Sequence, residues 1–283
     1  MPFFMKIAYG TYAMPTVPLE KALVTVAEIG YDGLELAIGP KHNSMPEQID
    51  ASKRQKLKKM FAELNLGVPA LFMLGSLLTE DKETHKKNLQ LTTQVMELAR
   101  DLDIGARPVI SMGIGGRSAS WEAQRDPLLR LLDDYAKVAA DEGFIFAIEP
   151  HSGAMVDRTE RAIWIMETLD NPYVRLHFDI VHFFMGGEEI EETVFKLVPY
   201  TAHTHVTDAK KTDEGYELVL MGQGDLDALT YVKAMHQAGW TDFITLEVSV
   251  RVWGREDYDV NQAAKQSYAV LDEAFKKAMI PRD

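Results

Sequence analysis

The chain contains no cysteine. This absence excludes disulfide bonds, thiolate metal sites and a thiol nucleophile. Carboxylate and imidazole groups remain as candidate metal ligands, and the sequence supplies 43 acidic residues and 8 histidines.

Long hydrophobic runs are also lacking. No apolar stretch approaches the ~18 residues that indicate a membrane span. The opening segment MPFFMKIAYG has neither a basic region followed by an apolar core nor a cleavage site. We therefore expect a cytoplasmic protein that does not associate with membranes.

Positive charge is in deficit, with 30 Lys and Arg residues against 43 acidic residues and a formal net charge of −13. Affinity for phosphate backbones depends on clustered basic side chains that release counterions. Nucleic acid is therefore disfavoured as a partner.

Short apolar runs alternate with longer charged, periodic segments over the whole length of the chain. The runs predict eight strands, at residues 5–9, 33–38, 67–72, 107–112, 144–149, 174–179, 201–206 and 243–248. Apolar residues three and four apart predict eight helices, near residues 18–29, 51–64, 82–103, 121–142, 159–169, 188–197, 225–238 and 260–278. With 283 residues and 46% hydrophobic content, this alternation predicts the α/β class and one domain over residues 1–283, a single (β/α)8 barrel. A doubly wound open sheet is the alternative.

Four polar side chains stand at the ends of predicted strands: Glu149 in FIFAIEPH, Asp179 in RLHFDIVH, His205 in TAHTHVTD and Glu247 in FITLEVS. Their intervals of 30, 26 and 42 residues match the length of a βα unit. The four converge only if the sheet closes, which favours the barrel. Three carboxylates and one imidazole suit one Mn²⁺, Mg²⁺ or Co²⁺ ion, and Zn²⁺ also fits.

Three further polar residues share the inward face of the predicted strands. His177 and His203 lie two positions before Asp179 and His205, so they point the same way one layer deeper. We expect them to be hydrogen-bonded core histidines or to orient a metal ligand. Glu35 also faces inward, either as a structural carboxylate or as part of the pocket.

Several segments, in their order and spacing, resemble the xylose-isomerase-like TIM-barrel sugar isomerases and epimerases, near the group of ketose 3-epimerases, hydroxypyruvate isomerases and inosose dehydratases. These segments are AIEPHSG, HFDIVHFF, HTHVTDAK, GQGDLD and TLEVS. The resemblance spans essentially the whole chain. It implies that Glu149 and Glu247 bind the metal and also move the substrate's protons, and that His182 contacts a substrate oxygen.

Two positions depart from the ketose 3-epimerase pattern. Met155 stands where that group has a further glutamate, and Lys211 stands where it has an arginine. Lysine keeps the charge but loses the planar, two-pronged grip. We expect Lys211 and His151 to contribute to a substrate-binding wall that differs from that of the group.

The expected reaction removes a proton beside a carbonyl and returns it to the same carbon or to its neighbour, on a small sugar bound near the metal. A dehydratase that expels a β-hydroxyl is the alternative, followed by a phosphodiesterase like endonuclease IV and a non-catalytic sugar-binding barrel. A homodimer or homotetramer is compatible with the sequence.

Two loop features allow more than one interpretation. Gly222-Gln223-Gly224 either presents amides to a phosphate or forms a plain turn before a helix capped by Asp225. Arg251 and Trp253 either close over the substrate or form a subunit contact.

Overall fold

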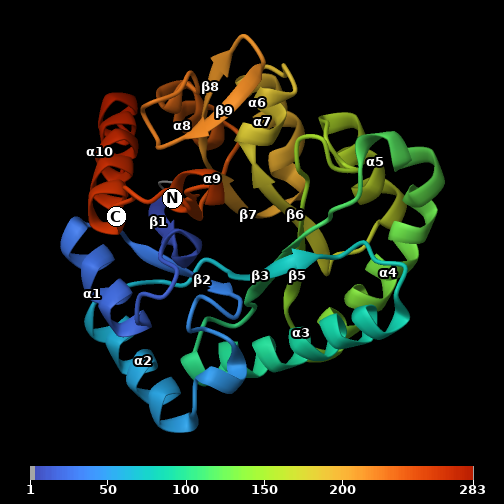
Figure 1. Ribbon diagram of the computed structural model, residues 1–283, viewed down its shortest axis with the longest axis horizontal. Helices are drawn as coiled ribbons and strands as arrows, with labels where there is room; N and C mark the ends of the chain where they lie inside the picture. The colour runs from blue at the N-terminus through green and yellow to red at the C-terminus, as the bar shows by residue number, and fades with distance from the viewer. Residues whose placement is uncertain (1–3, 283) are drawn as a thin grey trace.

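Eight parallel strands close into a barrel in the computed structural model, which describes residues 4–282. Their order around the barrel is β1-β10-β7-β6-β5-β4-β3-β2 (Figure 1). The strands are β1 (Lys6–Gly10), β2 (Gly33–Ile38), β3 (Leu71–Ser76), β4 (Val109–Gly113), β5 (Ile145–Glu149), β6 (Val174–Asp179), β7 (Thr201–Val206) and β10 (Phe243–Leu246). The predicted α/β barrel is confirmed.

Eight long helices surround the barrel, close to the predicted ranges (Figure 1). They are α1 (Leu19–Ile29), α2 (Ala51–Glu63), α3 (Lys82–Leu102), α4 (Trp121–Glu142), α5 (Thr159–Leu169), α7 (Ile190–Leu197), α8 (Ala228–Gln237) and α10 (Val260–Ala278). None of the helices within residues 4–282 combines the length and apolar character that a membrane span requires.

Alternation along β5 shows how the strands separate core from site. Phe146 is fully buried and stacks on Tyr135 of α4, with ring centroids 4.2 Å apart. Successive side chains point to opposite faces of a strand. Ala147 and Glu149 therefore point into the barrel, where the small Ala147 leaves space below the carboxylate.

Five of the eight strands differ from the predicted bounds, β1, β4 and β5 by one or two residues at an end. The other two are β3 and β10. β3 begins at Leu71 rather than residue 67, because Pro69 has no N–H to donate to the ladder. β10 ends at Leu246, so Glu247 follows the strand, although its N–H still donates to the carbonyl of Val206.

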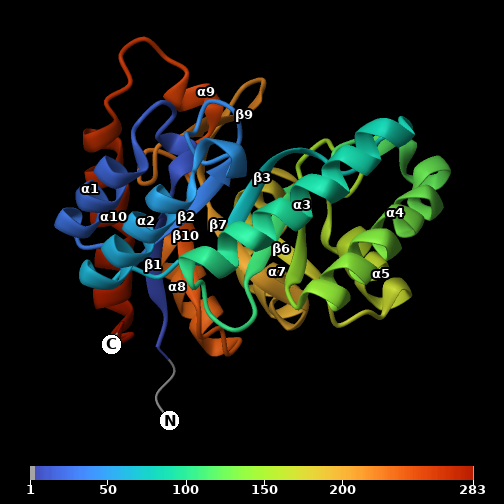
Figure 2. The ribbon, with the colours of Figure 1, turned by 90° about the horizontal axis from the view of Figure 1, so that it is seen from below.

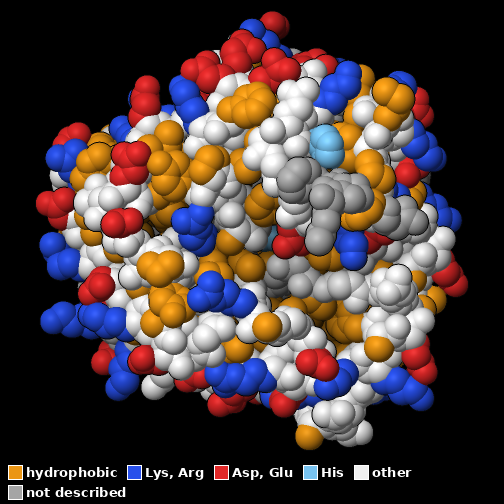
Figure 3. Space-filling view, turned by 180° about the vertical axis from the view of Figure 1, so that it is seen from behind, with side chains coloured by type: hydrophobic (Ala, Val, Ile, Leu, Met, Phe, Trp, Pro, Cys, Tyr) orange, Lys and Arg blue, Asp and Glu red, His pale blue; other side chains and the backbone are white. Residues whose placement is uncertain are grey.

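Three short elements were not predicted: an antiparallel hairpin of β8 (Asp208–Thr212) and β9 (Gly215–Val219), and two helices, α6 (Ile180–Met185) and α9 (Val250–Trp253). Each follows the carboxyl end of a barrel strand. Figure 2 shows β9 and α9 at the end of the barrel opposite the start of β1 and the end of α10. Figure 3 shows the face that holds the start of β1 and the end of α10, where acidic and basic side chains are interspersed around the rim.

The glycine turn before α8 surrounds a carboxylate of the protein itself. Asp208 Oδ2 accepts N–H groups from Gly222 and Gly224 at 2.9 Å, and Oδ1 accepts those of Ala209 at 2.8 Å and Leu226 at 3.1 Å. A Cβ at Gly224 would lie 2.2 Å from Asp208 Oδ1, so glycine is required there. The amides of this turn therefore bind the carboxylate of Asp208 rather than pointing to a site for a phosphate.

The capping residue of α8 also differs from the prediction. Asp227, not Asp225, caps the helix, since its Oδ1 accepts the N–H groups of Leu229 and Thr230. Asp225 instead accepts the N–H of Lys211 at 2.7 Å.

Candidate metal centre

The four predicted metal ligands meet at the carboxyl end of the barrel. Glu149 and Asp179 end β5 and β6, His205 is the penultimate residue of β7, and Glu247 follows β10. The register pairs His205 with Asp179 on one side and with Thr245 on the other. One ligand atom from each of the four residues lies within 4.8 Å of the others.

His205 lies at the middle of this cluster. Its Nδ1 is 2.9 Å from Glu247 Oε2 and 3.6 Å from Glu149 Oε1. Asp179 is fixed separately, because its Oδ1 accepts the N–H of Val181 at 3.0 Å and its Oδ2 accepts the hydroxyl of Thr207 at 3.1 Å. We call Glu149, Asp179, His205 and Glu247 the four-residue cluster.

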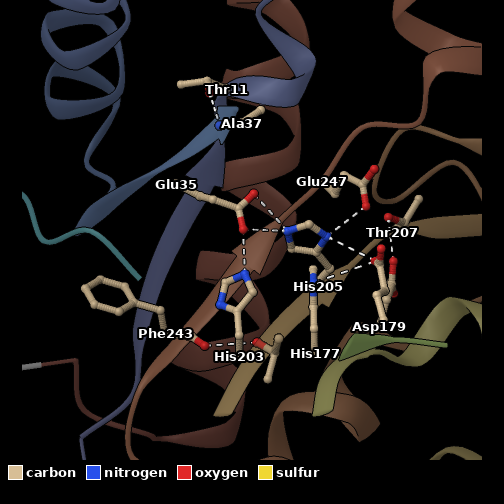
Figure 4. Close-up of polar contacts among 12 residues, drawn as sticks. Thr11, Glu35, Ala37, His177, Asp179, His203, His205, Thr207, Phe243 and Glu247 are labelled. Carbon is tan, nitrogen blue, oxygen red and sulfur yellow. Dashed lines mark hydrogen bonds and ion pairs between the residues drawn. The ribbon is translucent and has the colours of Figure 1, made fainter. Parts of the chain in front are cut away.

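A buried carboxylate contacts the His205 imidazole on the side away from the rest of the cluster. Glu35, fully buried on β2, lies 2.9 Å from Nε2 of His205 with both oxygens and 2.5 Å from Nε2 of His203. Figure 4 shows Glu35 and Glu247 on opposite sides of the His205 ring. A carboxylate on the far nitrogen fixes the orientation of a ligating histidine and raises its basicity.

The charges of the deeper groups are set by this network. Burial opposes the charge on Glu35, but His205 and His203 outweigh it and hold the pKa of Glu35 well below its usual range. Burial lowers the pKa of His205, yet Glu35 and Glu247 raise it well above normal. Burial and the neighbouring His205 lower the pKa of His177 well below its usual range.

The carboxylates of the cluster crowd one another. Burial, together with the Glu247 charge, raises the pKa of Asp179 to about 7. Glu149 is also buried, but His177 and His151 outweigh that effect and hold the pKa of Glu149 well below normal. The positive charge of His205 offsets these effects on the pKa of Asp179 only in part.

A divalent cation fits these residues. Ligand distances of about 2.0–2.6 Å place opposite donor atoms roughly 4–5 Å apart, which matches the 4.8 Å limit of the cluster. Oε1 of Glu149 is buried and has no hydrogen-bond partner among residues 4–282. A cation would bind this oxygen and would also offset the charge of Asp179.

Two adjoining cavities border the cluster. One, of about 390 Å³, has an aromatic and aliphatic wall that includes Tyr12, Phe72, Leu74 and Trp253. The other, of about 380 Å³, has a more polar wall. Tyr12, His151, Val250 and Glu247 line both cavities. Glu247 could therefore contact a molecule bound in either cavity.

The remaining predicted residues fall in different places. His151 and His182 lie beside Glu149 and line the polar cavity, with His182 in α6. Lys211 is exposed on β8 and lines neither of the two cavities. Met155 is fully buried. Neither departure from the ketose 3-epimerase pattern therefore places a charge in these cavities.

Arg251 and Trp253 both belong to cavity walls. Arg251 lines the polar cavity and Trp253 lines the apolar one. Trp253 meets the ring of Tyr12 edge-on, with centroids 5.5 Å apart. This arrangement supports their interpretation as pocket residues.

The site residues that were not predicted include Thr207, Tyr12 and Phe72. Thr207 holds Asp179, Tyr12 follows β1, and Phe72 packs edge-on against His205 with centroids 5.3 Å apart. Strand parity could have indicated Phe72, because alternate residues of a strand share a face and Phe72 lies on the face of β3 that points into the barrel. Tyr12 and Thr207 lie past their strands, where parity no longer applies.

Comparisons with known proteins agree with this architecture. The sequence profile described as xylose isomerase-like TIM barrel matches residues 23–274. The chain belongs to this family. Among curated proteins it is similar to fructoselysine 3-epimerase from Escherichia coli O157:H7, with 19% identity over 282 residues, covering 95% of this chain and 99% of that protein.

Two solved structures share the fold. The structure of an L-ribulose 3-epimerase superposes with a TM-score of 0.77 and 17% identity, covering 98% of this chain and 96% of that one. The IOLI protein, described with a bound zinc atom, gives a TM-score of 0.74 and 20% identity over 97% of this chain and 99% of that one.

Proposed function

We propose that the protein is a divalent-metal-dependent isomerase or epimerase of a small ketose or keto-polyol. The observation that carries this proposal is the placement of two glutamates, Glu149 and Glu247, in one cluster that could hold a metal ion and that borders both cavities. The named activities of the fructoselysine 3-epimerase and L-ribulose 3-epimerase relatives support the same class of reaction. A cytoplasmic location and a homo-oligomeric state stay predictions.

Glu149, Asp179, His205 and Glu247 would hold the cation. When bound, it supplies positive charge that stabilises the enediolate oxygens formed as the substrate loses a proton beside its carbonyl. Glu35 would leave Nδ1 of His205 available to the cation by accepting the proton on Nε2.

The two glutamates would divide the proton transfers. One carboxylate removes the proton from the carbon beside the carbonyl, and the other delivers a proton to the opposite face of that carbon or to the adjacent carbon. Each transfer contributes about 10²- to 10⁴-fold. Glu247, whose side chain is 12% exposed, borders both cavities, whereas Glu149 is 1% exposed and hydrogen-bonded to His151.

The side chains of the cavity walls indicate how a substrate could be bound. Tyr12, Phe72 and Trp253 offer apolar surface to the carbon skeleton, while His151 and His182 offer polar atoms to its oxygens. Because Lys211 is not in the cavity wall, the far end of the substrate must be recognised differently from the ketose 3-epimerase pattern.

Deuterium uptake tests the proposal. The Mn²⁺-loaded protein is incubated in D₂O with ketoses, keto-polyols and their phosphates, and products are followed by NMR and mass spectrometry. An isomerase or epimerase incorporates deuterium beside the carbonyl and keeps the composition of the substrate. Loss of water with a new enone absorbance would instead establish a dehydratase, and no exchange with any substrate would overturn the proposal.

A further inference from the structure

The two oxygens of Glu149 face different groups of side chains. Oε1 lies 3.6 Å from Nδ1 of His205 and 3.7 Å from Nε2 of His177. Oε2 lies 2.9 Å from Nε2 of His151. The four-residue cluster needs only one oxygen from Glu149, so the second is free to serve another group.

His151 and His182 stand together beside that second oxygen. Their ring centroids are 3.8 Å apart and their planes are inclined by 33°. One ligand atom from each ring lies within 4.8 Å of the other and of a Glu149 oxygen. Nδ1 of His182 is buried and has no hydrogen-bond partner in the described part of the chain. These donors come from two separate elements, the loop after β5 and the helix α6.

We propose that Glu149, His151 and His182 form a second metal site, with Glu149 bridging two ions. Two imidazoles and one carboxylate with an open coordination position are a set that Zn²⁺ uses in catalytic sites. The open position is available because the side chain of His151 is 43% exposed and lines both cavities. Bridged pairs of ions about 3.5–4 Å apart are a known arrangement in enzymes.

The two sites differ in the ions they favour. The four-residue cluster has three carboxylates and one imidazole, which suits a hard ion. The second site has two imidazoles, which favour Zn²⁺ and Co²⁺ over Mg²⁺. With a second ion bound, His151 and His182 would act on a substrate oxygen through that ion rather than directly. This rests on the proposed function and refines it, because Glu149 would then be a bridging ligand while Glu247 keeps its role in proton transfer.

Metal counting tests the second site without any substrate. The full chain is stripped with EDTA, dialysed to equilibrium against Co²⁺ alone, and assayed by elemental analysis and visible absorption. The wild type should bind two ions per chain. His151→Ala should bind one, and so should His182→Asn, which keeps a polar group of similar size at this more buried position.

Two further variants separate this inference from the proposed function. Asp179→Asn should lose the ion of the four-residue cluster and keep the other, whereas His236→Ala, which removes a histidine on α8, should keep both. One ion per chain in the saturated wild type, or two in folded His151→Ala and His182→Asn, would overturn the second site. Either result leaves the deuterium-uptake test of the proposed function unaffected.

Discussion

Replacing Asp179 with asparagine should stabilise the metal-free protein while abolishing tight binding in the four-residue cluster. Asparagine keeps an oxygen that can accept the N–H of Val181, and its amide can donate to the hydroxyl of Thr207. It cannot carry the charge that burial and Glu247 oppose. The substitution therefore removes an unfavourable interaction that the protein itself offsets only in part and that a bound cation would offset further.

The pKa of Asp179 sets the magnitude of this effect. Its folded value of about 7 exceeds the unfolded value of about 3.9, and each unit corresponds to about 1.4 kcal/mol. Because the folded pKa is the higher one, the cost is absent below about pH 3.9, grows as the pH rises, and is complete above about pH 7. The upper limit for the gain from Asp179→Asn at pH 8 is thus about 4 kcal/mol.

Denaturant unfolding in EDTA at pH 5 and pH 8 measures this gain. We expect Asp179→Asn to be more stable than the wild type at pH 8 by about 1–4 kcal/mol, with a smaller difference at pH 5. Saturating Mn²⁺ should reverse the order, since an ion bound only by the folded state stabilises it. Asp213→Asn, on the exposed hairpin turn, is the matched control. A variant that is less stable than the wild type in EDTA at pH 8 would refute the reasoning.

Three other changes have defined outcomes. Glu149→Gln and Glu247→Gln should each reduce kcat by about 10²-fold or more with the ion of the four-residue cluster retained, because glutamine offers an oxygen to the metal but cannot act as a general acid or base; steady-state kinetics with metal analysis checks this, and near-normal turnover would exclude the two-carboxylate scheme. Glu35→Gln should weaken Mn²⁺ binding about 10- to 100-fold in calorimetric titration, with Glu63→Gln as a surface control; unchanged affinity would contradict the supporting role. Asp208→Ala should lower the free energy of unfolding by about 3 kcal/mol or more, because it leaves four backbone N–H groups without their charged acceptor; a loss below about 1 kcal/mol would show that water replaces it.

The sequence was most informative where a residue lies inside a strand. The apolar runs placed β2, β6 and β7 at their observed bounds, and strand parity then placed His177 and His203 beneath Asp179 and His205. Parity works because a strand has a fixed two-residue repeat. The four-residue cluster could therefore be anticipated once a closed barrel was assumed.

The features that sequence could not supply lie beyond the strand ends or depend on long-range contacts. Asp208 binds amides up to 18 residues away, and no local pattern indicates such a pairing. Glu35 meets His205 across 170 residues, so its inward direction could be inferred but not its partner. The hairpin is largely exposed, which leaves it without a strong apolar alternation.

Anomalous diffraction from crystals soaked in Mn²⁺ tests the central claim most directly. A strong peak should lie about 2.0–2.6 Å from one atom of each of Glu149, Asp179, His205 and Glu247. The absence of a peak between these four groups, or one of the groups lying more than roughly 5 Å from the ion and therefore far outside ligand distance, would contradict the account.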